Sequence, residues 1–513
     1  MMHKKFYILL TIVFIIATFF RLYNLGITPP GLYPDEAMNG NNALEVLHTG
    51  DVKVFYPENN GREGLFINIQ AMFLSLFGNE PWVLRLVSAL FGIFTVVGIY
   101  FFVWALLRRY RYALAIAFSS AFFVAISFWH INFSRIGFRA IMAPFFLVWA
   151  LYLLVETFYQ TKRKSNAGSQ IISRDQNTDH FSLFALCLSA LAGLVYGLGM
   201  HSYIAYRATP LLIIIAFFFF KKYFDVSWKR AFGIFVVFVV GALIAFSPLA
   251  LYFAQNPQDF LGRTTQVSVS SSSTPLKDLG SNIVKTLGMF HVRGDGNWRH
   301  NYAGAPQLFW PVGILFLWGL GESIIRRIWK KHEQSLNIAM WISFWWILVG
   351  LLPVVISNEG LPHALRAILV IPPVFMIAGI GLVYAYEHIS ALVKKRAPLF
   401  VFGIVGACVL VAQAYVVYFV AWADHPHVQD AFSSKYVDIG RELNEINSGI
   451  KKYVVVNTGG VDVRGVAMPS QTVMFITDTF RKEEQEQKNI HYISSENQIP
   501  LLGDGVVFYL EAK

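Results

Sequence analysis

Residues 6–20 read FYILLTIVFIIATFF, an uninterrupted apolar run directly after the charged start MMHKK. The run is long and no small-residue cleavage site follows it, so we expect a retained signal anchor rather than a cleaved signal peptide. Runs of roughly 20 apolar residues recur along the chain of 513 residues, long enough to cross about 30 Å of hydrocarbon. Only 14% of the residues are charged, against about 25% in soluble globular proteins. The sequence therefore predicts an α-helical polytopic membrane protein.

The charges between the apolar runs predict how the chain is oriented. With the N-terminus in the cytoplasm, every short inside loop is basic, as the positive-inside rule requires, and residues 161–179 form a solvated linker. The net charge of +11 then reports orientation, and we expect no nucleic-acid partner. We expect a multi-pass protein of the cell (inner) membrane with its C-terminus and active site outside the cytoplasm. We count eleven spans, near residues 6–24, 82–105, 112–130, 140–158, 182–200, 203–220, 231–252, 307–325, 336–356, 365–388 and 398–421.

Three substantial segments then lie outside: a first loop of residues 25–80, a loop of residues 253–306, and a tail from residue 424. In the first loop we expect a short helix after Pro34, and a second, interfacial helix marked by the apolar stripe Leu65, Ile69, Met72, Phe73 and Leu76. The second outer loop contains a Ser-rich stretch at 267–275. The tail has an amphipathic helix and the strand-like runs YVVVN, TVMFIT and VVFYL. We therefore divide the chain into a transmembrane domain, 1–423, and a small extracytoplasmic α/β domain, 424–513.

The first loop carries three acids in a chain that otherwise avoids charge. Asp35 and Glu36 follow Pro34, and a carboxylate in the first turn of a helix gains from the helix dipole. That explanation covers one acid more easily than both, because adjacent helical residues point about 100° apart. We interpret one of the two as acting on a reacting group while the other holds the loop or a ligand. Glu63 opens the second helix and is a candidate for the same cavity; a helix-start charge is its alternative role.

Four arginines are predicted at one membrane depth on the outer side: Arg135, Arg139, Arg207 and Arg366. Each alone could extend its charge to the interface while its stem lies in lipid. Four together, on the side where positive charge is not favoured, indicate a site for an anionic headgroup, because planar guanidinium groups suit phosphate. His201, Tyr203 and Tyr206 precede Arg207 and are assigned to the same cavity. In this arrangement the first-loop acids face water and the arginines below them face lipid. Such a site suits a lipid-phosphate donor and a hydroxyl acceptor.

The polar run GDGNWRHN (294–301) is the other dense group of functional side chains. We interpret it as a lid over sugar or acceptor, with a merely structural role in the loop as the alternative. No histidine in the outer segments has a metal-ligand spacing such as HExxH, so we assign no metal ligands. A divalent ion bridging Glu63 and a loop histidine is kept as an alternative. The lid residues are Asp295, Asn297, Trp298, Arg299 and His300.

Several of these stretches resemble bacterial members of the GT-C glycosyltransferases, family 39 and its neighbours, which include protein O-mannosyltransferase-like and aminoarabinose-transferase-like proteins. The similar stretches are PDEA (34–37), HINFSRIGFRA (130–140), GMHSYIAYRATPLL (199–212), GDGNWRHNYAGAPQL (294–308) and LPHALRAILVIPPVFMIAG (361–379). The resemblance covers residues 1 to about 420. It implies transfer of one sugar from a polyprenyl-phosphate donor to an acceptor outside the cytoplasm.

The resemblance also implies roles for individual residues. The catalytic base of the family matches Asp35, with Glu36 beside it, and the second first-loop acid matches Glu63. The donor-phosphate arginines match Arg135 or Arg139, and Arg366. Two other classes of function remain as alternatives: a transporter or flippase of lipid-linked sugars, and an assembly protein whose tail binds a partner. The acids lie in an outer loop rather than in mid-span, and no internal repeat is evident, so the pattern favours the enzyme.

Overall fold

The computed structural model describes residues 2–168, 183–260, 273–329, 333–393, 396–498 and 505–511. Most of the Ser-rich stretch at 267–275, and the predicted linker beyond residue 168, lie outside the described residues. In the described part, a helix occupies each of the eleven predicted spans. These helices are α1 (Met2–Leu22), α4 (Pro81–Leu107), α5 (Ala113–Ile126), α7 (Met142–Gly168), α8 (Leu183–Gly199), α9 (Thr209–Phe224), α10 (Trp228–Gln255), α13 (Trp310–Ile328), α14 (Gln334–Val355), α15 (Ile371–Leu392) and α16 (Arg396–Tyr415).

Eight of these helices are long and apolar enough to cross a membrane by themselves, within the described ranges. A ninth span forms if α5 is joined to α6 (Phe128–Ser134) across a bend of 62°. Helix α8 is short, with 17 residues, and the last turns of α13 carry Glu322, Arg326 and Arg327. The predicted polytopic helical class is therefore confirmed, and within the described residues eight or nine spans meet the criteria of length and composition.

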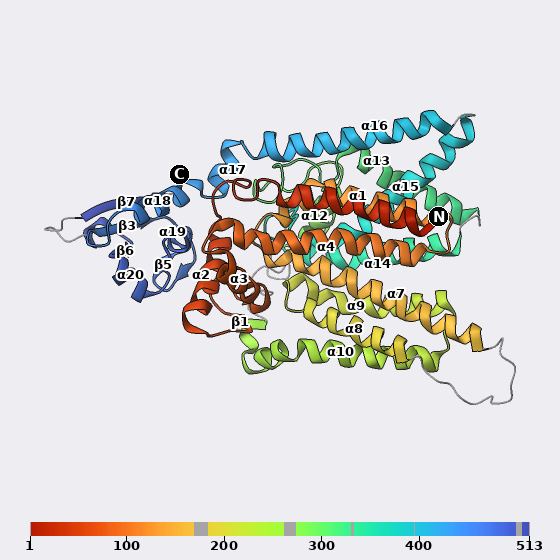
Figure 1. Cartoon of the computed structure of the whole chain (residues 1–513), viewed down its shortest axis with the longest axis horizontal. Helices are drawn as coiled ribbons and strands as arrows, with labels where there is room; N and C mark the ends of the chain where they lie inside the picture. Colours follow the sequence, from red (N-terminus) through yellow and green to blue (C-terminus); the bar gives the residue numbers. More distant parts are fainter. Residues whose placement is uncertain are drawn as a thin grey trace.

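The bundle is built around α4, α5, α7 and α15: α4 packs against α5 and α7, and α15 packs against α5 and touches α7. Helix α15 is the most deeply buried span, with 89% of its apolar window inside the protein, whereas α16 has 6%. Figure 1 shows α16 running along one side of the bundle. The first-loop helices and the C-terminal strands lie together at the end opposite the N-terminus. The first outer loop and the C-terminal segment thus share one end of the molecule.

The first outer loop folds into two helices joined by a short hairpin. Helix α2 (Pro34–Thr49) begins at the predicted proline and ends at Gly50, whose positive φ of 73° favours glycine. Strands β1 (Phe55–Tyr56) and β2 (Arg62–Glu63) pair antiparallel and lead into α3 (Gly64–Phe77). Part of the predicted stripe of α3 lies on its outer side, where Met72 is 54% and Leu76 is 68% exposed, whereas Leu65, Ile69 and Phe73 are half-buried against the bundle. An apolar face turned outward agrees with the predicted interfacial helix.

The C-terminal segment is a small α/β unit around a three-stranded parallel sheet. Its strand order is β6-β3-β7, with β3 (Lys451–Asn457) between β6 (Ile490–Ile493) and β7 (Gly505–Glu511). Residues 505–511 pair in register with 451–457, and 490–493 with 452–455. A two-stranded ribbon, β4 (Asp462–Val463) with β5 (Val466–Ala467), flanks the sheet. The helices of this unit are α17 (Pro426–Ala431), α18 (Ser434–Glu445), α19 (Ser470–Thr477) and α20 (Lys482–Lys488).

One predicted strand is wrong: the run TVMFIT is part of helix α19, not of the sheet. The cause is burial, because every residue from Ser470 to Phe475 is inaccessible to solvent. A helix buried on all sides loses its amphipathic period, so its sequence cannot be distinguished from that of a buried strand. Helix α19 then packs between α18 and α2, and Phe475 enters the hydrophobic cluster that includes Ala37 and Leu84.

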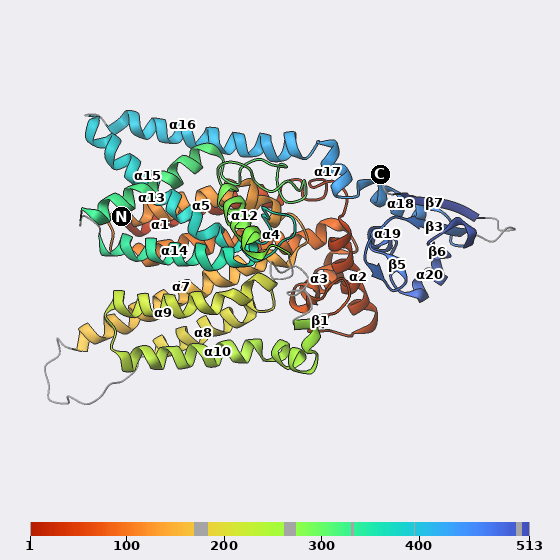
Figure 2. The ribbon, with the colours of Figure 1, turned by 180° about the vertical axis from the view of Figure 1, so that it is seen from behind.

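The C-terminal unit is attached to the first loop through α2. Asn41 Nδ2 donates to the carbonyl of Gln471 at 3.0 Å, and Thr472 Oγ1 donates to the carbonyl of Leu32 at 2.9 Å. At the exposed side, Arg464 binds both carboxylate oxygens of Glu45 at 2.9 Å. Figure 2 shows α19 and β5 facing α2 from the other side of the molecule. The N-terminal end of α2 is consequently enclosed between the bundle and the C-terminal unit.

Candidate functional site

Asp35 stands in the first turn of α2 and lines a cavity of about 900 Å³. The cavity lies between the start of α2, residues 296–299 of the second outer loop, and the C-terminal unit, whose acids Asp430 and Glu511 also line it. The Asp35 carboxylate accepts a hydrogen bond from Asn59 Nδ2 at 2.5 Å. Asp35 is partly accessible, so a carboxylate held in a fixed orientation faces a space that can hold a substrate.

Part of the predicted lid closes this cavity. Asn297, Trp298 and Arg299 all line it, and the Arg299 guanidinium lies 3.9 Å from the ring centre of Tyr33. The carbonyl of Trp298 accepts a hydrogen bond from Trp422 Nε1 at 3.0 Å. Burial, followed by the charge of Asp35, raises the pKa of the Tyr33 hydroxyl well above its ordinary value, although the Arg299 cation lowers it. Tyr33 therefore stays protonated beside the Asp35 carboxylate.

Glu36 points away from the cavity into the protein core. Its side chain is fully buried and forms an ion pair with Arg85 of α4, with 3.1 Å between Oε2 and Nε. The same oxygen accepts the backbone N–H of Gly137 at 2.7 Å. The adjacent acids thus diverge as helical geometry requires: Asp35 faces the cavity, whereas Glu36 fixes α2 to α4 and to the turn before Arg139. Of the two acids predicted for the catalytic site, Glu36 is therefore the one that holds the loop, and it does not line the cavity.

Glu63 brings two of the four predicted arginines together. Arg139 Nε donates to Glu63 Oε2 at 2.7 Å, and Arg207 Nη2 lies 3.6 Å from Glu63 Oε1. His201 is close enough for the charge of Glu63 to raise its pKa, but burial, the largest effect, lowers that pKa below the ordinary value. One carboxylate oxygen of Glu63 is therefore hydrogen-bonded to Arg139, and the other faces Arg207, so two cations surround this single acid. Among the described residues, Glu63 is not in the cluster of side chains placed to hold a metal ion.

The predicted ring of four arginines is not assembled, because the other two have different partners. Arg135 is fully buried and donates to the carbonyls of Phe20 and Thr28 at 3.1 and 2.8 Å. The Phe20 carbonyl belongs to the last turn of α1, where carbonyls lack partners within the helix. Arg366 pairs with Glu359 at 2.6 Å. Arg135 thus satisfies a helix end, and only Arg139 and Arg207 of the four converge.

Tyr203 and Tyr206 pack within the protein near Arg207 rather than along the Asp35 cavity. Tyr206 is fully buried, and its ring centre lies 5.5 Å from that of Tyr196. Tyr203 is 8% exposed. Both tyrosines belong to the hydrophobic core of the bundle and do not line the Asp35 cavity.

The segment 58–63 connects Asp35 with the arginine pair. Asn59 holds the Asp35 carboxylate, the carbonyl of Gly61 accepts from Arg139 at 3.5 Å, and Glu63 holds both arginines. Arg62, between them, donates to Asn39 and Asn42 of α2 at 2.9 and 2.5 Å. Burial, and then the charge of Arg139, lowers the pKa of Arg62 to about 10, so Arg62 remains a cation at neutral pH. One short hairpin therefore holds both Asp35, through Asn59, and the two arginines, through Glu63.

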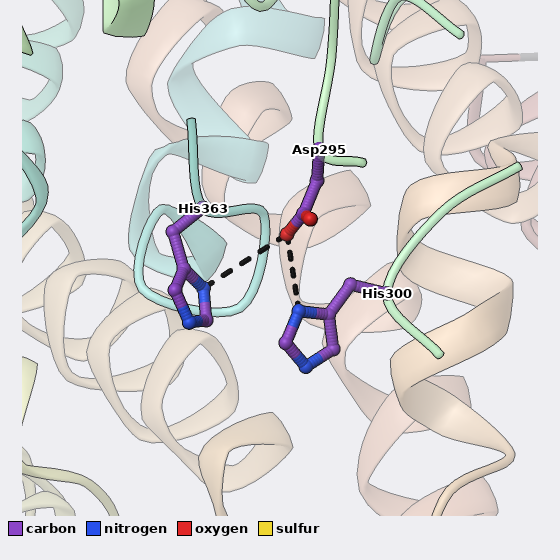
Figure 3. Close-up of side chains that lie close together, drawn as sticks. All are labelled: Asp295, His300 and His363. Atoms are coloured by element: carbon purple, nitrogen blue, oxygen red, sulfur yellow. Dashed lines mark hydrogen bonds and ion pairs between the residues drawn. The ribbon is translucent and has the colours of Figure 1, made fainter. Parts of the chain in front are cut away.

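Asp295 and His300 do not line the Asp35 cavity with the other lid residues. His300 Nδ1 lies 3.0 Å from Asp295 Oδ2, and His363 Nδ1 lies 4.0 Å from the same oxygen (Figure 3). Asp295 Oδ2 also accepts the backbone N–H of Ala364 at 2.8 Å. The predicted lid thus has two parts. Asn297, Trp298 and Arg299 face the cavity, whereas Asp295 and His300 contact the loop that follows α14.

Sequence reasoning missed two residues that shape the site, Asn59 and Arg85. Arg85 had a usable signal: it is a charged residue in the first turns of the otherwise apolar α4, and charges inside spans are costly enough to require a partner. Asn59 had none, because one amide in the polar run ENNGREG is indistinguishable from its neighbours. Its role depends on the hairpin that returns it to Asp35.

No protein-family model matches the chain, and no curated protein sequence matches it significantly. Solved structures are similar to it. ArnT from Cupriavidus metallidurans in the apo state has a TM-score of 0.52 at 14% identity, covering 93% of this chain and 85% of that one. The same protein bound to undecaprenyl phosphate has a TM-score of 0.51 at 13% identity, covering 95% and 88%.

The archaeal oligosaccharyltransferase AglB from Archaeoglobus fulgidus, in complex with an inhibitory peptide and a dolichol-phosphate, has a TM-score of 0.51 at 14% identity. The match covers 92% of this chain and spans 63% of the length of the archaeal protein. At these identities the likeness concerns the fold. The chain therefore has the GT-C fold, and the predicted fold class is confirmed.

Proposed function

We propose that the protein is a membrane glycosyltransferase that moves a sugar from a polyprenyl-phosphate donor to an acceptor hydroxyl outside the cytoplasm, with Asp35 as the catalytic base. The observation that carries this proposal is the orientation of Asp35: its carboxylate faces a cavity of about 900 Å³ at the end of a GT-C bundle. The fold adds support, because two proteins of similar fold were solved with undecaprenyl phosphate and with a dolichol-phosphate.

The chemistry is a direct displacement at the anomeric carbon. The acceptor hydroxyl forms a new C–O bond while its proton passes to the Asp35 carboxylate, which Asn59 holds in place. The bond between the anomeric carbon and the donor phosphate breaks, and its electron pair leaves with the polyprenyl phosphate. A single displacement inverts the anomeric centre. Asp35 requires accessibility and orientation for this role, and it has both.

The leaving phosphate needs positive charge more than it needs a proton. We assign this task to Arg139 and Arg207, which share the single carboxylate of Glu63 and so keep an excess of positive charge. Guanidinium groups bind phosphate through paired N–H donors. Replacement of Arg139 or Arg207 by Gln should weaken donor binding, whereas Arg366→Gln, at a site paired with Glu359, should not.

The experiment is sugar release from a panel of radiolabelled polyprenyl-phosphate sugars by the purified full-length protein. The native form should release the sugar of one donor. Asp35→Asn should slow release at least about a hundredfold, within the range for a positioned base. Glu511→Gln, which neutralises a carboxylate that the C-terminal unit contributes to the lining of the same cavity, should leave the rate near that of the native protein. Near-native release by folded Asp35→Asn protein would refute the assignment.

A further inference from the structure

Two outer loops that are distant in sequence bring an aspartate and two histidines into one cluster. Asp295 and His300 belong to the loop between α12 (Pro275–Gly288) and α13, whereas His363 belongs to the loop between α14 and α15. One ligand atom from each of the three side chains lies within 4.8 Å of the others. Their side chains are 4%, 9% and 15% exposed, respectively. Figure 3 shows both imidazole rings directing Nδ1 toward the Asp295 carboxylate.

We propose that Asp295, His300 and His363 bind a divalent transition-metal ion of the Zn²⁺ type. One carboxylate oxygen and two imidazole nitrogens are ligands that Zn²⁺ accepts at about 2.0–2.2 Å. Tetrahedral coordination at such bond lengths separates ligand atoms by about 3.4 Å. The separations of 3.0 Å to His300 and 4.0 Å to His363 bracket that value, so small side-chain rotations complete the geometry. Three protein ligands leave the fourth position for water or another ligand.

The carboxylate is held in place for this role by backbone groups. Asp295 Oδ1 accepts the N–H of Asn297 at 2.8 Å, and Oδ2 accepts the N–H of Ala364 at 2.8 Å. Such outer contacts orient the ligands of metal sites. A hydrogen bond between Asp295 and His300 would account for two members of the cluster without an ion. His363 Nδ1 lies 4.0 Å from the same carboxylate oxygen and accepts the backbone N–H of Arg366 at 3.4 Å, a long contact that a metal ion at Nδ1 would replace.

The ion would fasten the second outer loop above the Asp35 cavity. The loop that supplies Asp295 and His300 also presents Trp298 and Arg299 to that cavity. Joining it to the loop of His363 fixes both ends of the lid segment relative to the bundle. The site is therefore a positioning site, and its existence does not depend on the proposed glycosyl transfer.

Metal binding is tested on the full-length protein in detergent, with any affinity tag removed. After treatment with a chelator and desalting, Zn²⁺ is titrated against a competing fluorescent chelator, and bound zinc is counted by mass spectrometry. The native protein should bind one equivalent. Asp295→Asn and His363→Gln should each lower the affinity at least about tenfold, the minimum effect reported for contacts that support a metal site. His427→Ala, an exposed histidine outside the cluster, should bind Zn²⁺ as the native protein does.

A second measurement separates loss of binding from loss of fold. Zn²⁺ should raise the unfolding temperature of the native protein and of His427→Ala but not that of His363→Gln, because only binding to the folded state stabilises it. Failure of the native protein to retain one equivalent would overturn the proposal. Equal affinity in the native protein and the two cluster variants would identify adventitious binding and would overturn it as well.

Discussion

Substitution Glu36→Gln tests the contact that holds the first loop against the bundle. In the native protein the Glu36 carboxylate pairs with Arg85 at 3.1 Å and accepts the N–H of Gly137 at 2.7 Å, and both charged side chains are completely buried. Glutamine has the same size but no charge, and its amide nitrogen would face the N–H donors of Arg85 and Gly137. Arg85 keeps the carbonyls of Pro29 and Gly31, at 2.6 and 2.7 Å, but loses its counter-ion.

Removing one partner from a buried ion pair costs about 3–5 kcal/mol, because the other charge is left uncompensated. The upper part of that range is expected for Glu36→Gln, since the hydrogen bond to Gly137 is also weakened. Glu80→Gln is a matched control, because Glu80 is an exposed acid at the start of the same α4. Exposed substitutions of this kind usually change stability by less than about 0.5 kcal/mol.

The assay is unfolding of the purified protein in mixed micelles titrated with SDS, followed by circular dichroism. Arg85→Gln and the double variant complete a thermodynamic cycle, in which the pair should show a coupling of about 2–3 kcal/mol. A cost below about 1 kcal/mol for Glu36→Gln would refute the reasoning. Asp35→Asn should behave in the opposite way, with lost activity and nearly unchanged stability, because its side chain faces the cavity.

Three further predictions concern the attachment of the C-terminal unit. Gly40→Ala should destabilise the protein by about 1–3 kcal/mol in the same SDS titration, because a Cβ at this position would lie 2.5 Å from ring carbons of Phe475. Alanine has the better helix propensity, so higher stability of the variant would contradict the predicted clash. Arg464→Ala should speed proteolytic release of the unit, by an amount limited to about 1 kcal/mol because the side chain is partly exposed. Burial raises the pKa of Glu45, but the hydrogen bond and charge of Arg464 outweigh it and lower the pKa. The stability from this carboxylate is present above its unfolded pKa of about 4.3 and is lost as the pH falls through the lowered value, so acid should speed release in the native protein and not in Arg464→Ala.

The helical bundle was predictable because the hydrocarbon core imposes a length and a composition on every span. Helices α1, α4 and α10 follow directly from that constraint. The C-terminal unit follows weaker rules, since burial on all sides erased the periodic pattern of α19. Its sheet was predictable only in part: β3 and β7 are apolar runs with many β-branched residues, whereas β6, with the sequence IHYI, is too short and mixed to recognise.

The candidate site was predictable where the signal is local and unpredictable where it depends on direction around the bundle. Asp35 is fixed by the proline that starts α2, so its sequence context is sufficient. Arg135 and Arg139 are four residues apart, and a common membrane depth, with the one face that this spacing gives in a helix, assigned them to one ring. The chain turns between them, so Arg135 enters the core while Arg139 reaches Glu63. The position of a residue along a span predicts its depth in the membrane, but it does not predict toward which neighbour the side chain points.

The directions of the adjacent acids of the first loop, Asp35 and Glu36, depend on each other. A helix rotates by about 100° per residue, so when Glu36 is fixed in the core, the direction of Asp35 is fixed as well. Glu36 also binds Gly137, two residues before Arg139, and thereby sets the distance between the first turn of α2 and the arginine pair. The buried acid therefore determines where the acid at the cavity stands relative to Arg139 and Arg207, the arginines that we propose bind the donor phosphate. This accounts for two carboxylates side by side in a sequence that otherwise avoids charge: one faces the cavity, and the other fixes its position.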